Sequence, residues 1–161
     1  MTPVTPVTPI APADRIPHIL NHSRTIAVVG LSHKPHRASF DVARYMQAAG
    51  YRIIPVNPNE VEVLGEKAYA SLTEAAAHET FEMVNCFRNS EDILPIVDEA
   101  IALGGSITSV WMQLGIANAK AAAKAEAAGL LVVQDHCLKI DHRVLRLRGL
   151  LLPDIASSLP D

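Results

Sequence analysis

Two stretches of the chain gather residue types that could bind an anion or carry thiol chemistry. The first runs from Gly30 to Ser39, and four of the five positions 33–37 are His, Lys or Arg. A glycine that allows a tight turn, a cluster of cations and a serine that could begin a helix are together typical of a phosphate-binding loop. A basic turn exposed to solvent would have the same composition, and both interpretations stay open on this motif alone.

The second stretch, residues 134–142, places Cys137 between His136 and Lys139. Cationic neighbours favour the thiolate, so Cys137 could be a nucleophile. With Asp135 and the histidines it could instead ligate a metal, but zinc needs four ligands at recognisable spacing and only one cysteine is local. We predict no metal and no catalytic residue, and we keep an enzyme that uses Cys137 as the alternative.

The loop after Gly30 departs from the dinucleotide-binding fingerprint G-x-G-x-x-G, because Ser32 and Pro35 stand where two further glycines belong. An NAD site also needs an acidic residue after the second strand to hold the ribose hydroxyls, and Asn57 and Pro58 take that place. The sequence therefore favours a phosphate-containing ligand other than NAD.

Short apolar runs alternate with amphipathic segments from residue 25 onward, and these elements must position both stretches. The predicted strands are 25–30, 52–56, 83–87, 107–112 and 130–134. The predicted helices are 39–49, 71–78, 91–103, 117–128 and 140–148, with Ser39, Ser71 and Ser90 as N-caps of the first three. Buried strands that alternate with helices predict an α/β fold: a doubly wound Rossmann-type domain with a five-stranded, mainly parallel sheet and helices on both faces.

Ligands of such folds lie outside the carboxyl ends of the strands, so the residues after each strand are candidate contacts. Phe87 and Arg88 would offer an apolar wall beside a cation after the third strand. Gln113 and Gly115 would contact amide groups of a ligand after the fourth. The groove would suit a long ligand with both charged and apolar parts.

Composition limits the classes of function. The 161 residues are 49% hydrophobic and 19% charged, which fits one folded domain. A net charge of −3 and an aromatic content of 4% argue against nucleic acid as a partner, and no apolar run approaches the roughly 20 residues that cross a membrane. With two cysteines and no signal-peptide pattern, we expect a cytoplasmic protein with reduced thiols.

A set of residues in and around the predicted strand ends matches, in order and spacing, a pattern found in known proteins. The set comprises positions 27–32, Arg37 with Ser39, positions 51–58, Gly65 with Glu66, Tyr69, Ser71 with Leu72, Phe87 with Arg88, positions 111–115, Asp135, Cys137 and His142. With this set the chain resembles the small CoA-binding proteins of the YccU-like type, which share the Rossmann-type fold of the CoA-binding domain of succinyl-CoA synthetase α-subunits. It departs from them at His136, where Arg is frequent, and at Ala38, where Pro is common.

The resemblance implies that coenzyme A lies across the strand ends. The pyrophosphate would meet the backbone amides of Gly30, Leu31 and Ser32. Arg37 and Ser39 of the same loop would hold phosphate oxygens, and the basic composition of the loop adds Lys34 as a further phosphate contact. The adenosine would be flanked by Asn57 and Pro58, and the pantetheine path would be lined by Phe87, Arg88, Gln113, Leu114 and Gly115, with Cys137 near its thiol end.

We therefore expect a binding protein for coenzyme A or an acyl-CoA, non-catalytic or regulatory, with an interaction subunit of an acyl-CoA enzyme as a further alternative. Residues 16–148 would form the CoA-binding domain, followed by a tail at 149–161. Residues 1–15 form a Pro-rich arm with prolines at 3, 6, 9 and 12, a spacing that matches polyproline II. That arm is either a disordered leader or a segment that docks on a homo-oligomer or a partner enzyme.

Overall fold

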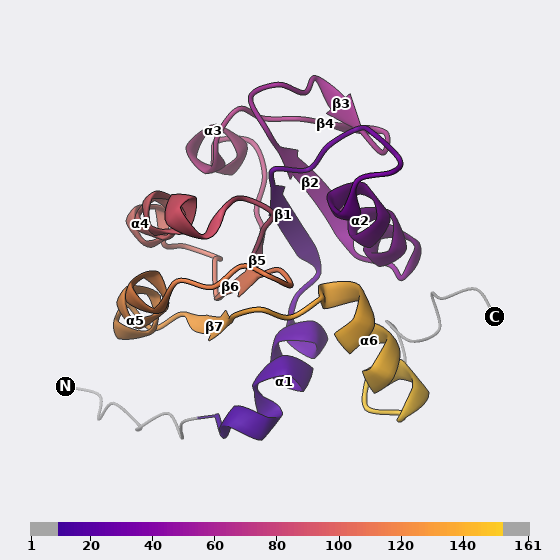
Figure 1. Ribbon diagram of the computed structural model, residues 1–161, viewed down its shortest axis with the longest axis vertical. Coiled ribbons are helices and arrows are strands. Elements are labelled where there is room, and N and C mark those ends of the chain that lie inside the picture. The colour runs from indigo at the N-terminus through magenta and orange to yellow at the C-terminus, as the bar shows by residue number, and fades with distance from the viewer. Residues whose placement is uncertain (1–9, 153–161) are drawn as a thin grey trace.

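The computed structural model describes residues 10–152 and contains a five-stranded sheet between two layers of helices (Figure 1). The strands stand in the order β2-β1-β5-β6-β7, and all four neighbouring pairs are parallel. Their bounds are β1 Thr25–Val29, β2 Arg52–Val56, β5 Met83–Cys86, β6 Ser109–Met112 and β7 Leu131–Val133. The predicted α/β architecture and its five strands are confirmed.

The helices divide between the two faces of the sheet. One face carries α3 (Leu72–Ala76), α4 (Ile93–Leu103) and α5 (Ala119–Ala127), and the other carries α1 (Arg15–His22), α2 (Ala38–Ala48) and α6 (Leu138–Leu147) (Figure 1). Alternate strand residues serve the two layers: Ala27 and Val29 pack with α3–α5, and Ile26 and Val28 pack with α1, α2 and α6. Because both faces are buried, β1 is apolar along its whole length after Thr25.

The direction in which successive strands are added to the sheet reverses between β1 and β5. After β1 the chain adds β2 on one side, and after β2 it returns to add β5, β6 and β7 on the other. At such a point the loops that leave two adjacent strands run to opposite faces, which opens a crevice at their carboxyl ends. The crevice between β1 and β5 is therefore where a ligand is expected.

Several local predictions need correction. Ser39 lies inside the first turn of α2, and Arg37 is the N-cap residue. Ser90 lies in a 3-10 turn (Ser90–Asp92) before α4, where its hydroxyl accepts a hydrogen bond from Ala117 N at 3.1 Å. The cap by Ser71 is confirmed, since its hydroxyl accepts from Glu74 N at 3.1 Å.

The structure also adds elements that the sequence did not predict. Helix α1 precedes the sheet, and a hairpin of β3 (Glu62–Val63) and β4 (Glu66–Lys67) follows β2. The hairpin turns through Leu64 and Gly65, both with positive φ. Each of its strands has only two residues, so it carries no alternating pattern for the sequence to reveal.

Some expectations stay predictions. Most of the Pro-rich arm and of the predicted tail lies outside the described residues, and the domain boundaries at 15/16 and 148/149 are not tested. Among residues 10–152, no helix combines the length and the apolar character that crossing a bilayer requires.

Candidate functional site

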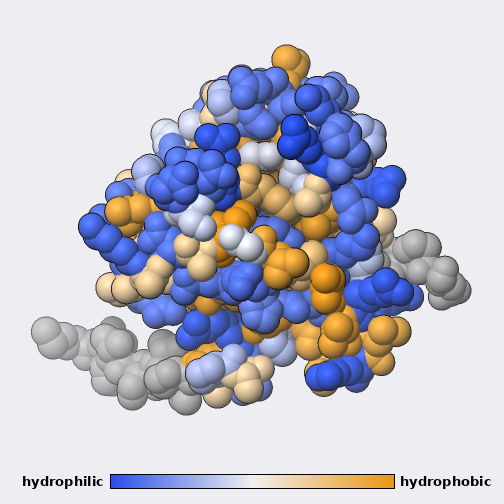
Figure 2. Space-filling model, in the orientation of Figure 1, coloured by the Kyte–Doolittle hydropathy of each residue, from blue (hydrophilic) through white to orange (hydrophobic). Residues whose placement is uncertain are grey.

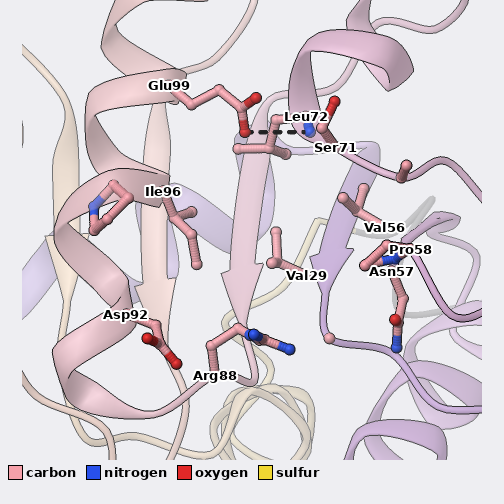
Figure 3. Close-up of a pocket in the computed structure, with 13 residues that line it drawn as sticks. Val29, Val56, Asn57, Pro58, Ser71, Leu72, Arg88, Asp92, Ile96 and Glu99 are labelled. Atoms are coloured by element: carbon pink, nitrogen blue, oxygen red, sulfur yellow. Dashed lines mark hydrogen bonds between the residues drawn. The ribbon is translucent and has the colours of Figure 1, made fainter.

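Four neighbouring hollows follow the carboxyl ends of the strands. The central hollow, about 510 Å³, lies between the loops after β1, β2 and β5. It shares Gly30, Asn57 and Arg88 with an apolar hollow of about 300 Å³ between β2 and α4 (Figure 3). A hollow of about 520 Å³ extends past Phe87 to the loop after β6, and one of about 610 Å³ extends past Asn57 to the β3-β4 hairpin. Together they form a groove at the predicted crevice.

The central hollow concentrates positive charge that the protein leaves unpaired. Lys34, Arg37 and Arg88 line it, and within residues 10–152 none of their side chains has a hydrogen bond or ion pair. Several other basic side chains are paired with carboxylates, as Arg52 is with Glu79 at 2.8 Å. The N-terminus of α2 opens beside these cations, and in the described chain no side chain caps it. Free cations at an uncapped helix N-terminus make this hollow suited to an anion.

The loop after β1 is held by bonds of its own. Gly30 has a φ of +89° and donates its N–H to Val56 O at 2.8 Å. Ser32 N donates to the Ser39 hydroxyl at 3.0 Å, while Leu31 is buried. The amides of Gly30 and Ser32 were predicted to meet a pyrophosphate, but in this conformation both donate to protein acceptors. Ser39 was expected to hold phosphate, and here its hydroxyl accepts from this loop.

The loop after β2 is tied to the loop after β1 by side chains. Asn57 donates from Nδ2 to Leu31 O at 3.1 Å and accepts from Asn59 N at 3.0 Å. Glu60, which was not a predicted contact, lies in the central hollow with both carboxylate oxygens within 2.9 Å of His33 Nδ1. Since Glu60 and His33 are 27 positions apart, no local motif could have revealed the pair.

The apolar hollow lies between the sheet and the helix layer that contains α4. Val29 and Val56 face Ile96 of α4 across it, and Arg88 and Asp92 lie at one end, with Glu99 at the other (Figure 3). Glu99 accepts from Thr73 Oγ1 at 2.7 Å and from the amides of Leu72 and Thr73 at 3.3 Å each. The wall formed by α4 could not be predicted from the sequence, because Ile96 and Glu99 belong to an ordinary amphipathic helix pattern. Pro58, which was predicted, also lines it.

The predicted residues after β6 separate in the structure. Gly115 lines the hollow beside Phe87 and Arg88. Gln113 is only 5% exposed, and its Oε1 accepts from Leu138 N at 3.3 Å and from Asn85 Nδ2 at 3.4 Å. Leu114 is 62% exposed but lines none of the four hollows. Of the predicted pantetheine contacts here, the structure brings Gly115 to the groove and turns the Gln113 amide to the interior.

Cys137 also lies away from the groove. It occupies the N-cap position of α6, partly buried against the cluster under that helix. The basic side chains beside it are engaged: His136 Nδ1 lies 2.9 Å from Asp141 Oδ2, and Lys139 Nζ lies 2.9 Å from Asp41 Oδ2. Cys137 lines none of the four hollows, so the structure does not bring it to the other predicted contacts.

His142 is a fully buried histidine of α6. Its Nδ1 is 3.1 Å from the Tyr45 hydroxyl, its ring makes T-shaped contacts with the rings of Tyr45 and Tyr51, and its Nε2 has no partner among the described residues. Burial, and to a lesser degree the charge of Arg146, lowers the pKa of His142 to about 4. The ring is therefore neutral near pH 7 and packs as part of the core. No group of three or more possible ligands that could hold a metal occurs in residues 10–152.

Comparison with known proteins identifies the family. The family described as "CoA binding domain" matches residues 24–143, which include all five strands of the sheet. The chain belongs to the CoA-binding domain family. The uncharacterized protein YneT of Bacillus subtilis (strain 168) is 40% identical over 131 residues, which are 81% of this chain and 94% of YneT.

Solved structures of similar proteins share the fold. A hypothetical protein from Pyrococcus horikoshii OT3 matches with a TM-score of 0.77 at 34% identity, over 90% of this chain and 99% of its own. The protein ID.343 from Thermus thermophilus matches with a TM-score of 0.73 at 34% identity, over 80% and 94%. Acetyl-coenzyme A synthetase 1 of Ca. Korarchaeum cryptofilum matches at 19% identity with a TM-score of 0.60, over 73% of this chain and 27% of its own, a likeness in fold alone.

Proposed function

We propose that this CoA-binding domain binds coenzyme A or an acyl-CoA in the groove, with the phosphates in the central hollow, and catalyses no reaction there. The observation that carries the proposal is the set of unpaired cations Lys34, Arg37 and Arg88 around one hollow at the N-terminus of α2. Exposed cations that gather without carboxylate partners in an acidic protein raise the local concentration of anions.

The hollows on either side of the central one are lined by carboxylates, so they suit the uncharged parts of the ligand. Asp92 and Glu99 line the apolar hollow, and Glu62 and Glu74 line the hollow by the hairpin. Carboxylates disfavour phosphate, and Glu60, the one carboxylate that lines the central hollow, is held by His33 at 2.8 Å. The adenosine therefore fits the apolar walls beside Asn57 and Pro58, while the phosphates stay in the central hollow. The pantetheine then extends along Phe87, Arg88 and Gly115, where the hollow is open.

The residues that line the groove support a binding role. None of those lining the four described hollows is a cysteine or a histidine, the side chains that most often act as nucleophile or general base near neutral pH. Cys137 and His142, the two candidates for such chemistry, both lie outside the groove. The groove thus offers shape and charge to a ligand.

Calorimetric titration with coenzyme A, dephospho-CoA and NAD tests the proposal. We expect heat of binding with coenzyme A and a loss of affinity of about 10-fold or more when Lys34 and Arg37 are both replaced by Ala, since each can make a charge-assisted bond to phosphate. The variant should also lose part of the weakening seen between about 0.1 M and about 1 M salt.

Lys120→Ala is the matched control, because Lys120 is an exposed lysine of α5 that lines none of the four hollows. Its affinity and salt dependence should equal those of the unsubstituted protein. The absence of heat with every CoA species, or an unchanged affinity in the double variant, would contradict the proposal.

A further inference from the structure

Helix α6 presents apolar side chains on two opposite faces. Leu138, His142 and Leu145 are buried against the sheet. On the outer side, Ile140, Val144 and Leu147 are between 38% and 76% exposed, and Leu150 and Leu152 just after the helix are 50% and 42% exposed. Figure 2 shows an apolar area over α6. A helix that only faces solvent on its outer side carries polar residues there, so this face is built for contact.

The charged side chains that remain unpaired at the edges of this outer face are all positive. Arg143 and Arg148 stand on its two sides, both exposed, and within the described chain neither side chain has an ion pair or hydrogen bond. The one carboxylate of the helix, Asp141, is held by His136 at 2.9 Å. A complementary surface must therefore be apolar along its centre and acidic along its edges.

We propose that the outer face of α6, formed by Ile140, Val144, Leu147, Leu150 and Leu152, binds an amphipathic helix of a partner protein whose apolar stripe is bordered by Asp or Glu. The spacing carries the choice of a helix: 140, 144 and 147 follow intervals of four and three residues, which is the seam that packs against another helix. Acidic borders would pair with Arg143 and Arg148 as charged edge residues do in coiled coils.

Charge and composition together favour this partner over a second copy of the chain or a membrane. In a two-fold dimer through antiparallel α6 helices, Arg143 of one copy would meet Arg143 of the other, and like charges disfavour that contact. An anionic membrane would satisfy the arginines, but the outer face lacks the Trp and Phe that anchor interfacial helices. The surface is also separate from the groove, since none of its residues lines the four hollows.

The test uses two synthetic helical peptides with the same leucine stripe, one bordered by Glu and one by Lys. Nitrogen-edited NMR spectra of the labelled full chain should shift at residues 140–152 with the Glu-bordered peptide, and fluorescence anisotropy should give at least 10-fold weaker binding for the Lys-bordered peptide. Leu147→Asp should lower the affinity by about 10-fold or more. Arg143→Glu combined with Arg148→Glu should reverse the preference between the peptides.

Val61→Asp is the control, because Val61 is 86% exposed and lies outside α6. It should leave peptide binding unchanged, and thermal unfolding of all variants should stay close to that of the unsubstituted protein, since the replaced side chains are exposed. Three results would overturn the proposal: no binding of the Glu-bordered peptide up to about 1 mM, a dimer in sedimentation that Leu147→Asp dissolves, or binding to phosphatidylglycerol vesicles without binding to the peptide.

Discussion

Gly30 holds the most constrained backbone position of the groove. A β-carbon placed on it would lie 2.5 Å from Phe87 O, and its φ of +89° already disfavours any other residue. The close approach of the two loops thus depends on a missing side chain. If a Gly30 variant fails to bind coenzyme A, displacement of the loop after β1 would explain the failure as well as loss of a contact between Gly30 and the ligand.

We predict that Gly30→Ala lowers the free energy of unfolding by about 2 kcal/mol or more, because positive φ and the clash with Phe87 O add. Gly129→Ala is a matched comparison, since Gly129 has a φ of +90° and a β-carbon added there would have nothing within 4 Å. Urea unfolding of both variants separates the two effects. Equal losses would show that the clash relaxes without cost.

The two cysteines should differ sharply in reactivity. Cys86 is fully buried, and burial raises the pKa of its thiol to about 12, whereas Cys137 is partly exposed. We predict that iodoacetamide modifies one thiol in the folded protein and two in urea, and that Cys137→Ser leaves none reactive in the folded state. Peptide mapping by mass spectrometry identifies the site. Alkylation of Cys86 in the native protein would mean that the end of β5 opens.

At the scale of elements, α6 is fixed by a histidine that must stay neutral. The pKa of His142 is about 4 in the folded protein and about 6.5 in the unfolded chain. The unfolded state therefore binds a proton first as the pH falls, and His142 contributes full stability above about pH 6.5 that is lost progressively towards pH 4. Protonation of His142 in the unfolded chain lowers the free energy of unfolding by about 3 kcal/mol over this pH range.

Replacement of His142 by Phe tests this linkage, because Phe keeps an aromatic ring between Tyr45 and Tyr51 without the titration. We predict that the free energy of unfolding of the variant falls less steeply between pH 6.5 and pH 4 than that of the unsubstituted protein. The comparison of slopes cancels the carboxylates that both proteins share. Parallel slopes would place the protonation of His142 outside the stability of the fold.

The sequence was sufficient for the elements that carry a pattern of their own. The apolar strands and the amphipathic α4 and α5 could be predicted to within a few residues, and Ser71 could be recognised as a cap from Glu74 three positions on. The hairpin β3-β4 could not, since its pairing is decided by two residues on each side. Ser39 appeared to be a cap because the local sequence does not show that its hydroxyl accepts a hydrogen bond from Ser32 N.

In the whole molecule, the position of the candidate site could be predicted from the sequence, but the side-chain contacts within it could not. The position of the groove followed from the fold class alone, because parallel strands bring their carboxyl ends to one edge. The inward amide of Gln113 and the pairing of Glu60 with His33 depend on residues more than 20 positions apart that meet only when the sheet forms. Those contacts decide which predicted residues can face a ligand, and a single sequence does not contain them.

The parallel direction of all five strands confines the groove to one end of the sheet, and this leaves the opposite end open to protein engineering. Gly104, Gly105 and Ser106 lie exposed before β6, at the edge of the sheet remote from the carboxyl ends. A fluorescent reporter domain inserted between Gly104 and Gly105 would keep the bond from the Ser106 hydroxyl to Phe81 O and would not obstruct the groove. Helix α4 lines the apolar hollow and ends just before Gly104, so it would connect a ligand in the groove to such a fusion and make this domain a scaffold for a metabolite biosensor.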